Sequence, residues 1–185
     1  MTNPQIYATL RSEIQRAVSR GQISIPIQES QAKQLPYLQA CILEGLRKFP
    51  PVSQLRERVV PAGGDTLGGF HLPGGTYVGL NSWGLQLDKE VYGDDADLFR
   101  PERWLTEDAA QLEAMHQTHG LIFGHGSTKC LGTAMAMMEI TKVTFELLRN
   151  FDITISNPHK PWSSICYGIF YQQDFNVCLS PASER

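Results

Sequence analysis

The chain opens with apolar residues that recur every three or four positions. This set consists of Ile6, Leu10, Ile14 and Ala17. Charged side chains occupy many of the positions between them, so the pattern predicts an amphipathic helix over the first twenty residues that ends at Gly21. Residues 21–33 have no such periodicity and are predicted to form a linker.

Two further segments show the spacing of a helix. Residues 37–49 combine good helix formers with leucines and isoleucines spaced for burial, and two prolines that follow end this helix. Residues 131–150 carry apolar side chains three and four positions apart. This spacing predicts a long helix that opens directly after Cys130, with the cysteine at its amino end.

Strand patterns fill most of the remaining chain. Residues 58–83 have Val, Thr and Tyr alternating with Gly and Pro, which predicts a small antiparallel sheet with a Pro-Gly-Gly turn between two short strands. Three more short strands are predicted near the end, the last two joined as a hairpin through the polar residues 171–174. Residues 88–121 read as a long irregular connection that needs a reason to be ordered. The fold class is therefore predicted to be α-rich α+β.

Composition narrows the class of protein. The chain has 185 residues, 42% of them apolar and 19% charged, which predicts one globular domain over residues 1–185. A net charge of −3 with dispersed Lys and Arg argues against a nucleic-acid partner. The first twenty residues lack the apolar run of a signal peptide, and no membrane segment is expected in this chain.

The cysteines suggest where the protein works. The four cysteines are Cys41, Cys130, Cys166 and Cys178. They are widely spread and lack the paired short spacings of a disulfide framework or a zinc ribbon. A reducing, intracellular setting is therefore expected.

The segment around Cys130 carries the clearest candidate chemistry. A cysteine at a helix amino terminus faces unpaired backbone N–H groups and the positive end of the helix dipole, both of which favour a metal-binding thiolate. Gly124 and Gly126 can adopt positive φ and turn amides toward the sulfur, while Gly132, one turn into the helix, lets the backbone approach a flat macrocycle. Phe123 can screen the sulfur from water.

Other interpretations of this cysteine remain open. Cys130 could be a buried structural residue, or it could bind zinc together with His116, His119 and His125, whose spacing is typical of metal ligands. A zinc site, however, gives no reason for the glycines around Cys130.

The arrangement Phe-x-x-Gly-x-x-x-Cys-x-Gly, formed here by Phe123, Gly126, Cys130 and Gly132, resembles the haem-ligand signature of the cytochrome P450 family in a form typical of fungal members. The resemblance implies that Cys130 is the axial ligand of a haem b iron. It also implies that this chain is the C-terminal part of the cytochrome P450 fold.

Two other motifs in the family's order strengthen the resemblance. Glu44 and Arg47 resemble its Glu-x-x-Arg motif, and residues 99–104 resemble its Pro-Glu-Arg-Phe motif with Trp104 where Phe is commoner. The resemblance implies a structural triad of Glu44, Arg47 and Arg103 that pins the long irregular segment. A buried carboxylate shared by two guanidinium groups favours planar, bidentate geometry.

The match departs from the family at the haem propionates. Thr128 stands where Arg or His is frequent, with Lys129 beside it, and residues 86–88 are Gln-Leu-Asp where His-Arg-Asp is common. Arg58 matches an arginine that family members use for a propionate, and it is the best candidate for the ionic contact. Arg58 and Lys129 could equally be solvated surface charges.

For function, the resemblance implies a monooxygenase that oxidises a small organic substrate with O2 and electrons from an NADPH-dependent reductase, in fungal secondary metabolism. Members of the family are more than twice as long, and many are anchored to the endoplasmic reticulum. The amino-terminal half and the distal helix are expected to be absent here, so an inactive remnant or an interaction module is the alternative. Residues 51–55 and 167–171 are the candidate substrate-facing stretches.

Overall fold

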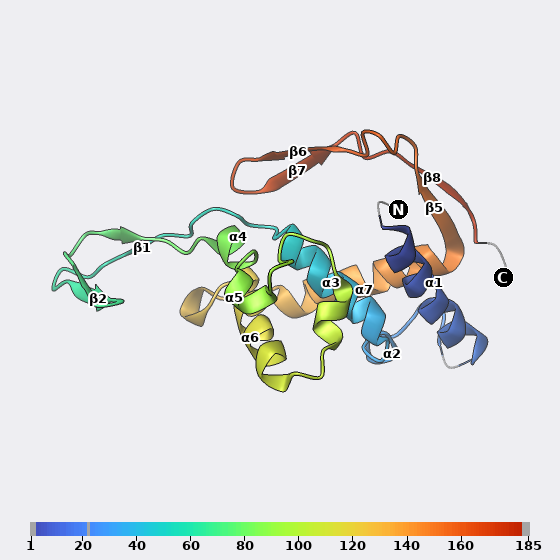
Figure 1. Cartoon of the computed structure of the whole chain (residues 1–185), viewed down its shortest axis with the longest axis horizontal. Helices are drawn as coiled ribbons and strands as arrows, with labels where there is room; N and C mark the ends of the chain where they lie inside the picture. Colours follow the sequence, from blue (N-terminus) through green and yellow to red (C-terminus); the bar gives the residue numbers. More distant parts are fainter. Residues whose placement is uncertain (1–2, 22, 183–185) are drawn as a thin grey trace.

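The computed structural model describes residues 3–21 and 23–182. A helical body lies at the centre, and two strand-built extensions leave it, one carrying β1 to β4 and the other β5 to β8 (Figure 1). The helices are α1 Pro4–Ser19, α2 Glu29–Ala32, α3 Pro36–Lys48, α4 Ser82–Leu85, α5 Lys89–Tyr92, α6 Ala109–Gly120 and α7 Thr133–Asn150, with 3-10 turns η1 Pro101–Leu105, η2 Leu121–Phe123 and η3 Gly126–Thr128. The α-rich α+β prediction is confirmed.

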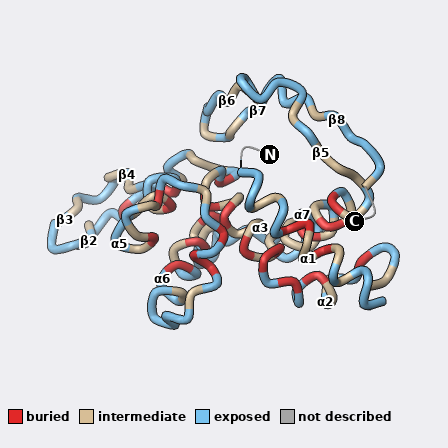
Figure 2. Tube along the Cα trace, turned by 45° about the vertical axis from the view of Figure 1, so that its right-hand side comes forward, coloured by how far each residue is buried: buried red, intermediate tan, exposed pale blue. Residues whose placement is uncertain are grey.

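The main core lies between α1, α2, α3 and α7, where red buried segments meet in Figure 2. Ile14, Leu38 and Phe145 are almost completely buried there. Glu13 of α1 also fastens the start of α3, because its carboxylate accepts hydrogen bonds from the backbone N–H groups of Tyr37 (2.9 Å) and Leu38 (2.8 Å). The three helices expected from periodicity are thus present, the last beginning at Thr133.

Two segments expected to be irregular contain helices. Residues 29–32 form α2 within the expected linker, and residues 109–120 form α6 within the expected connection. The prediction was wrong for α6 because this helix buries only Met115 and His119, which leaves no apolar stripe to detect. Its start is fixed instead by Asp108, whose side chain accepts hydrogen bonds from two backbone N–H groups of the first turn.

Among the described residues, eight strands form four separate two-stranded antiparallel ladders. They are β1 Arg58–Val59 with β4 Tyr77–Val78, β2 Asp65–Leu67 with β3 Phe70–Leu72, β5 Phe151–Ile155 with β8 Val177–Pro181, and β6 Ser163–Cys166 with β7 Phe170–Gln173. The Pro-Gly-Gly turn does join two strands, β3 and β4, but each of these pairs with an earlier strand. One small sheet was predicted, and two ladders are observed.

The hairpin expected near the end of the chain lies elsewhere. Residues 171–173 belong to β7 and do not form a turn, and the hairpin joins β6 to β7 through residues 167–169. Gly168, with φ +82°, permits that tight turn, and Asp174, at φ +61°, redirects the chain toward β8. β8 returns to pair with β5, with Ile153 opposite Leu179.

Aromatic side chains connect the β6–β7 hairpin to the helical body. Phe170 lies edge-on to both Phe49, at the end of α3, and Trp83 of α4, with ring centroids 6.1 and 5.3 Å apart. Trp162 in turn contacts Phe49 and Phe175 in edge-on geometry. Within residues 3–21 and 23–182, no helix is both long and apolar enough to cross a membrane.

Candidate functional site

Cys130 lies on an exposed loop, residues 123–132, which we call the Cys130 loop. Its backbone N–H donates a 2.8 Å hydrogen bond to the carbonyl of Phe123 and closes the loop. Its own carbonyl accepts a 2.8 Å hydrogen bond from the hydroxyl of Thr133, the first residue of α7. The sulfur therefore sits beside the amino end of α7, but the helix does not open directly after Cys130 as predicted.

Glycines shape this loop. Gly124 and Gly126 have φ of +81° and +65°, so both adopt the left-handed conformation that was predicted for them. Gly132 is the residue that precedes α7, so the prediction that it lies one turn into the helix was wrong. A Cβ at Gly132 would lie 3.8 Å from the sulfur of Cys130, at ordinary van der Waals contact, so Gly132 is a direct neighbour of the sulfur.

A cavity of about 380 Å³ lies between the Cys130 loop and the segment that carries β1 and β4. It is lined by Arg56, Arg58, Leu67, Leu80, Gly124, His125 and Thr128, among others. The guanidinium of Arg58 donates a hydrogen bond to the hydroxyl of Thr128 and to two nearby backbone carbonyls. Lys129 is exposed on the same loop, and its backbone N–H donates to the carbonyl of Gly126 at 3.1 Å.

Arg56 is a residue of this site that sequence reasoning missed. It has a left-handed φ of +49°, and its guanidinium donates to the carbonyls of Leu121 (2.7 Å) and Ile122 (3.3 Å) and to the hydroxyl of Ser82. These bonds fix the segment that leads into the Cys130 loop against α4. No sequence signal separates Arg56 from Arg58, since its role depends on the backbone turn.

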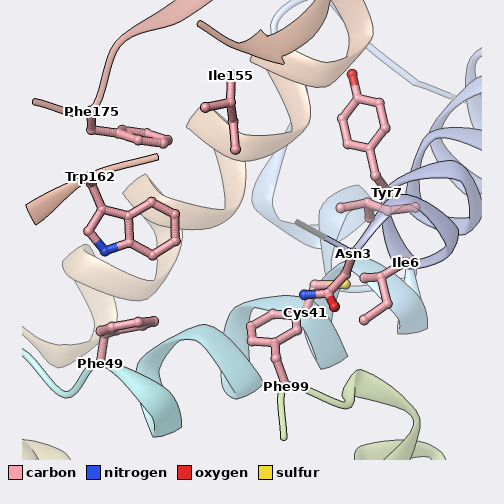
Figure 3. A pocket seen from close by; sticks show the side chains of 10 residues that line it. Asn3, Ile6, Tyr7, Cys41, Phe49, Phe99, Ile155, Trp162 and Phe175 are labelled. Atoms are coloured by element: carbon pink, nitrogen blue, oxygen red, sulfur yellow. The ribbon is translucent and has the colours of Figure 1, made fainter. Parts of the chain in front are cut away.

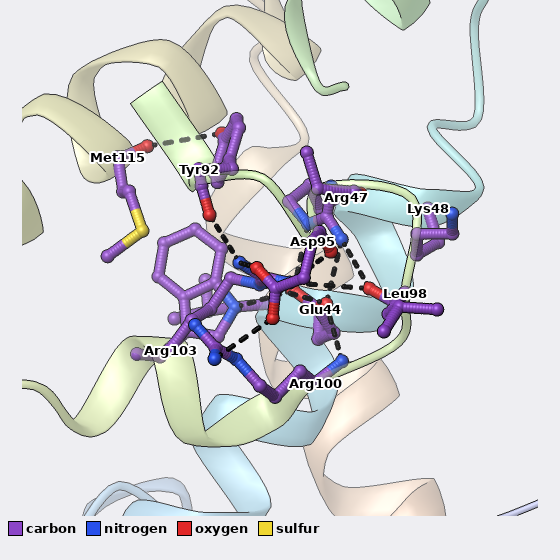
Figure 4. Close-up of polar contacts among 12 residues, drawn as sticks. Glu44, Arg47, Lys48, Tyr92, Asp95, Leu98, Arg100, Arg103 and Met115 are labelled. Carbon is purple, nitrogen blue, oxygen red and sulfur yellow. Dashed lines mark hydrogen bonds and ion pairs between the residues drawn. The ribbon is translucent and has the colours of Figure 1, made fainter. Parts of the chain in front are cut away.

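The structure brings Glu44, Arg47 and Arg103 together in the interior (Figure 4). Arg47 binds Glu44 through two hydrogen bonds of 2.8 Å, from Nε to Oε2 and from Nη2 to Oε1. Arg103 donates from Nε to Oε1 at 3.2 Å, so only Arg47 binds the carboxylate in the bidentate mode. The backbone N–H of Arg100 and the indole N–H of Trp104 complete the set of donors. We call Glu44, Arg47 and Arg103 the Glu44 triad.

The two arginines of the triad also hold the segment between α4 and η1. Arg47 donates hydrogen bonds to three backbone carbonyls. Arg103 also donates to three, at distances of 2.6, 3.0 and 3.4 Å. Those carbonyls belong to Gln86, Tyr92, Asp95, Ala96 and Leu98. The long connection was predicted to need a reason to be ordered. The buried guanidinium groups of Arg47 and Arg103 provide it, because they bind the backbone carbonyls of this connection.

Glu44 is ionised in this setting. Burial by itself raises the pKa of a carboxyl group, but the hydrogen bonds from Arg47 and Arg100 and the charges of Arg47 and Arg103 outweigh it. The net effect lowers the pKa of Glu44 below its ordinary value. The interior of the protein therefore holds a carboxylate anion between two guanidinium cations.

Gln86 occupies the position where the family often has a residue that contacts haem. Its side chain points into the helical body, where it donates to the carbonyl of Thr118 at 2.9 Å and accepts from the hydroxyl of Tyr92 at 2.8 Å. Gln86 is completely buried. Its polar side-chain atoms are both engaged within the helical body.

The structure does not bring together the side chains of the zinc alternative. His119 is buried and its Nε2 lies 3.1 Å from the carbonyl of Leu43, whereas His116 and His125 are exposed. Among the residues that the structure describes, no three His, Cys, Asp or Glu side chains are placed to hold a metal ion together. A metal site built on Cys130 and the histidines would need such convergence.

The two candidate substrate-facing stretches contact each other. The backbone N–H of Ser53 donates to the carbonyl of Gly168 at 2.9 Å, and the Ser53 hydroxyl lies 2.8 Å from the sulfur of Cys166. A Cβ at Gly168 would come within 2.9 Å of the Gln54 side chain, so the approach of the hairpin turn requires glycine here.

An apolar cavity of about 450 Å³ opens between α1, α3 and the strand extension, with Phe49, Phe99, Trp162 and Phe175 on its wall (Figure 3). The Cys41 side chain also faces it. Burial, followed by the charges of Glu102, Glu13 and Glu44, raises the pKa of this thiol to about 12. Cys41 therefore stays a neutral thiol at physiological pH.

Comparison with known proteins places this geometry in context. The family model described as Cytochrome P450 matches residues 1–174. The cytochrome P450 monooxygenase aba1 of Botryotinia fuckeliana (strain B05.10) is 40% identical over 177 residues, which cover 96% of this chain and 35% of that protein.

Two further fungal proteins give the same result. The cytochrome P450 monooxygenase ABA1 of Pyricularia oryzae (strain 70-15 / ATCC MYA-4617 / FGSC 8958) is 38% identical over 174 residues, covering 94% of this chain and 34% of that protein. The pisatin demethylase of Fusarium vanettenii is 38% identical over 180 residues, covering 97% and 33%. The chain thus spans about a third of the length of the curated relatives it matches.

Proposed function

The chain belongs to the cytochrome P450 family, and on that basis we propose that it is the haem-binding part of a haem-thiolate monooxygenase, with Cys130 as the axial ligand. The observation that carries the proposal is the position of Cys130. Its exposed thiol lies on a glycine-shaped loop that leads into a long helix, and other residues of this loop, Gly124, His125 and Thr128, line a cavity together with Arg56 and Arg58.

The residues around Cys130 fit haem b. A single thiolate is the one ligand that the protein must supply to the iron, and Cys130 presents it at the surface of the loop. The carboxylates of haem need cationic and hydrogen-bonding partners, and the neighbouring cavity offers Arg58 and the Thr128 hydroxyl. Lys129 provides a second cation at the same loop.

Bound through a thiolate, haem supplies the chemistry that activates O2 and transfers one oxygen atom to an organic substrate. The chain's own residues hold the ligand in place. The hydrogen bond from the Cys130 N–H to the carbonyl of Phe123 closes the loop that presents the sulfur. We propose that the Phe123 side chain limits the access of water to it. Gly126 and Gly132 carry no side chain that would hinder the approach of haem to Cys130.

The Glu44 triad acts in this proposal as scaffold and takes no part in the reaction. It anchors the chain between α4 and η1, while Arg56 anchors the approach to the Cys130 loop. We further propose that residues 51–55 and 167–171, which contact each other, face the substrate. The electron donor would be an NADPH-dependent reductase.

The substrate class is proposed as a small organic molecule of fungal secondary metabolism. The relatives support this choice, because they are fungal monooxygenases and include a pisatin demethylase. The apolar wall of the 450 Å³ cavity adjoins the β6–β7 hairpin, because Phe49 on this wall contacts Phe170 of β7. A substrate of this class would be largely apolar.

The test is a haem titration of the purified chain, followed by an absorption spectrum of the reduced protein under carbon monoxide. The wild type should bind haem and give the red-shifted band that a thiolate ligand produces. Cys130→Ser should lose that band, whereas the matched control Cys166→Ser, at another exposed cysteine, should keep it. A thiolate-type band that survives in Cys130→Ser, or a wild type that retains no haem, would contradict the proposal.

A further inference from the structure

Trp104 is bound to the buried carboxylate of the Glu44 triad. Its indole Nε1 lies 3.0 Å from Oε2 of Glu44, and the side chain is almost completely buried. Oε2 accepts only one other hydrogen bond among those described, from Nε of Arg47, whereas Oε1 accepts three. The indole N–H therefore fills an acceptor position that would otherwise be left unsatisfied in the interior.

The ring of Trp104 also contacts His119, which lies in the last turn of α6. The two rings meet edge-on, with centroids 5.2 Å apart and an interplanar angle of 80°. Burial, together with the charge of His116, lowers the pKa of His119 to about 4 despite its hydrogen bond to Leu43, so the imidazole is neutral near pH 7. Since the carbonyl of Leu43 can only accept, Nε2 of His119 carries the proton and donates to it at 3.1 Å.

His119 is thus held from two sides by residues that belong to one unit. Leu43 precedes Glu44 on α3, and Trp104 is bound to Glu44 itself. The chain continues from His119 through Gly120 into η2, where the carbonyl of Phe123 accepts the hydrogen bond from the Cys130 N–H at 2.8 Å. Contacts therefore link Glu44, Trp104 and His119, and the chain leads directly from His119 through η2 into the Cys130 loop.

We propose that Trp104 is a positioning residue for the Cys130 loop. Its indole N–H is fixed by the Glu44 carboxylate, and its ring, together with the Leu43 carbonyl, fixes His119 and through it the entry to residues 121–130. This proposal rests on the proposed function only where its test uses bound haem.

The experiment compares Trp104→Phe, which keeps an aromatic ring but removes the N–H, with His119→Leu, which leaves every hydrogen bond to Glu44 in place. The control is Phe145→Leu, a buried aromatic of the main core between α1, α2, α3 and α7. The first readout is amide hydrogen exchange of residues 121–130 in the chain without haem. Both test variants should speed exchange of the Cys130 amide by about tenfold, the effect of one lost hydrogen bond to a charged or buried group.

Phe145→Leu should speed amide exchange in residues 121–130 only by the amount that follows from the lower global stability of this variant. The double variant Trp104→Phe/His119→Leu should exchange little faster than either single variant, because both changes break the same connection. If exchange there follows global stability equally in all variants, or if the two changes add, the proposal is overturned. If Trp104→Phe does not fold, His119→Leu provides the same test.

The second readout is the spectrum of the reduced, carbon monoxide-bound protein after haem loading. Trp104→Phe should convert part of the thiolate-type band into the band of a protein that has lost the thiolate, while Phe145→Leu should keep the wild-type ratio. A wild type that binds no haem would count against the proposed function. The exchange result would still decide the role of Trp104.

Discussion

The guanidinium of Arg58 donates a hydrogen bond to the hydroxyl of Thr128, although the two residues are 70 positions apart in the chain. This contact joins β1 to the Cys130 loop, and both residues line the 380 Å³ cavity. An arginine already held at such a site loses little side-chain freedom when an anion binds. Thr128 stands where the family frequently has a basic residue. The cation at this place in the structure is Arg58, which comes from another element and contacts Thr128.

Arg58→Gln should weaken haem binding by roughly tenfold, because one charge-assisted hydrogen bond to a haem carboxylate is lost. A haem titration monitored by absorbance measures the dissociation constant. Arg20→Gln, at an exposed arginine beyond the end of α1, is the control and should leave the constant unchanged. Equal affinity in Arg58→Gln and the wild type would show that the carboxylates are bound elsewhere.

Glu44→Ala should lower the free energy of unfolding by about 3 to 5 kcal/mol, since it leaves two buried guanidinium groups without their anion. Glu29→Ala breaks an exposed pair with Lys33 four residues away, and it should cost about 0.5 kcal/mol or less. Urea unfolding of the two variants measures both values. A similar small loss in each would mean that the Glu44 triad does not stabilise the fold.

Stability should fall as the pH drops from 6.5 toward 4, through the titration of His119. Its pKa is about 4 in the folded chain against 6.5 ordinarily, so the unfolded chain binds the proton more readily. Above pH 6.5 the imidazole is neutral in both the folded and the unfolded chain, so it does not affect the free energy of unfolding. Below pH 6.5 only the unfolded chain gains the proton readily, and the free energy of unfolding decreases by up to about 3 kcal/mol as the pH reaches the folded pKa. Urea unfolding at several pH values measures this slope.

His119→Leu is the control for this pH dependence and should flatten the curve between pH 4 and 6.5. Glu44 contributes in a different window. Because the pKa of Glu44 is lowered on folding, its stabilisation is present above the ordinary value of 4.5 and is lost as the pH falls through the folded pKa. A curve for His119→Leu with the wild-type slope above pH 4.5 would rule out the histidine as its source.

Gly126→Ala should destabilise the chain by about 1 to 2 kcal/mol, because an L-residue is strained at φ +65° even though the space around it is open. Gly120, also with open space, has φ −56° at the end of α6, and Gly120→Ala should be neutral or slightly stabilising. Thermal unfolding of both variants gives the comparison. Equal effects would argue against strain in the Cys130 loop.

The helices that bury a continuous apolar stripe were predictable from the sequence. Ile14 and Phe145 lie on such stripes, and α1, α3 and α7 were found within three residues of their expected bounds. α6 was missed because its ends are set by Asp108 and by packing around Met115. Strand pairing was predicted poorly because two-residue and three-residue strands carry too little alternation to specify their partners.

The candidate site was predictable to the extent that its residues form motifs. The spacing of Glu44 and Arg47 indicated a shared helix face, and the glycines of the Cys130 loop indicated positive φ. The contacts of Arg56 and Trp104 were not predictable, because they join segments far apart in the chain through a backbone turn and a buried indole. Such contacts arise only once the tertiary structure has formed.

The hydrogen bonds that Arg47 and Arg103 donate to backbone carbonyls have a consequence for evolution. A carbonyl oxygen is the same whatever side chain its residue carries, so the path of residues 86–98 is specified by two arginines on neighbouring elements more than by its own side chains. Exposed positions such as Asp94, Asp97 and Leu98 are therefore free to drift. Related chains can diverge there, acquiring new surface chemistry, while the interior beneath them stays unchanged.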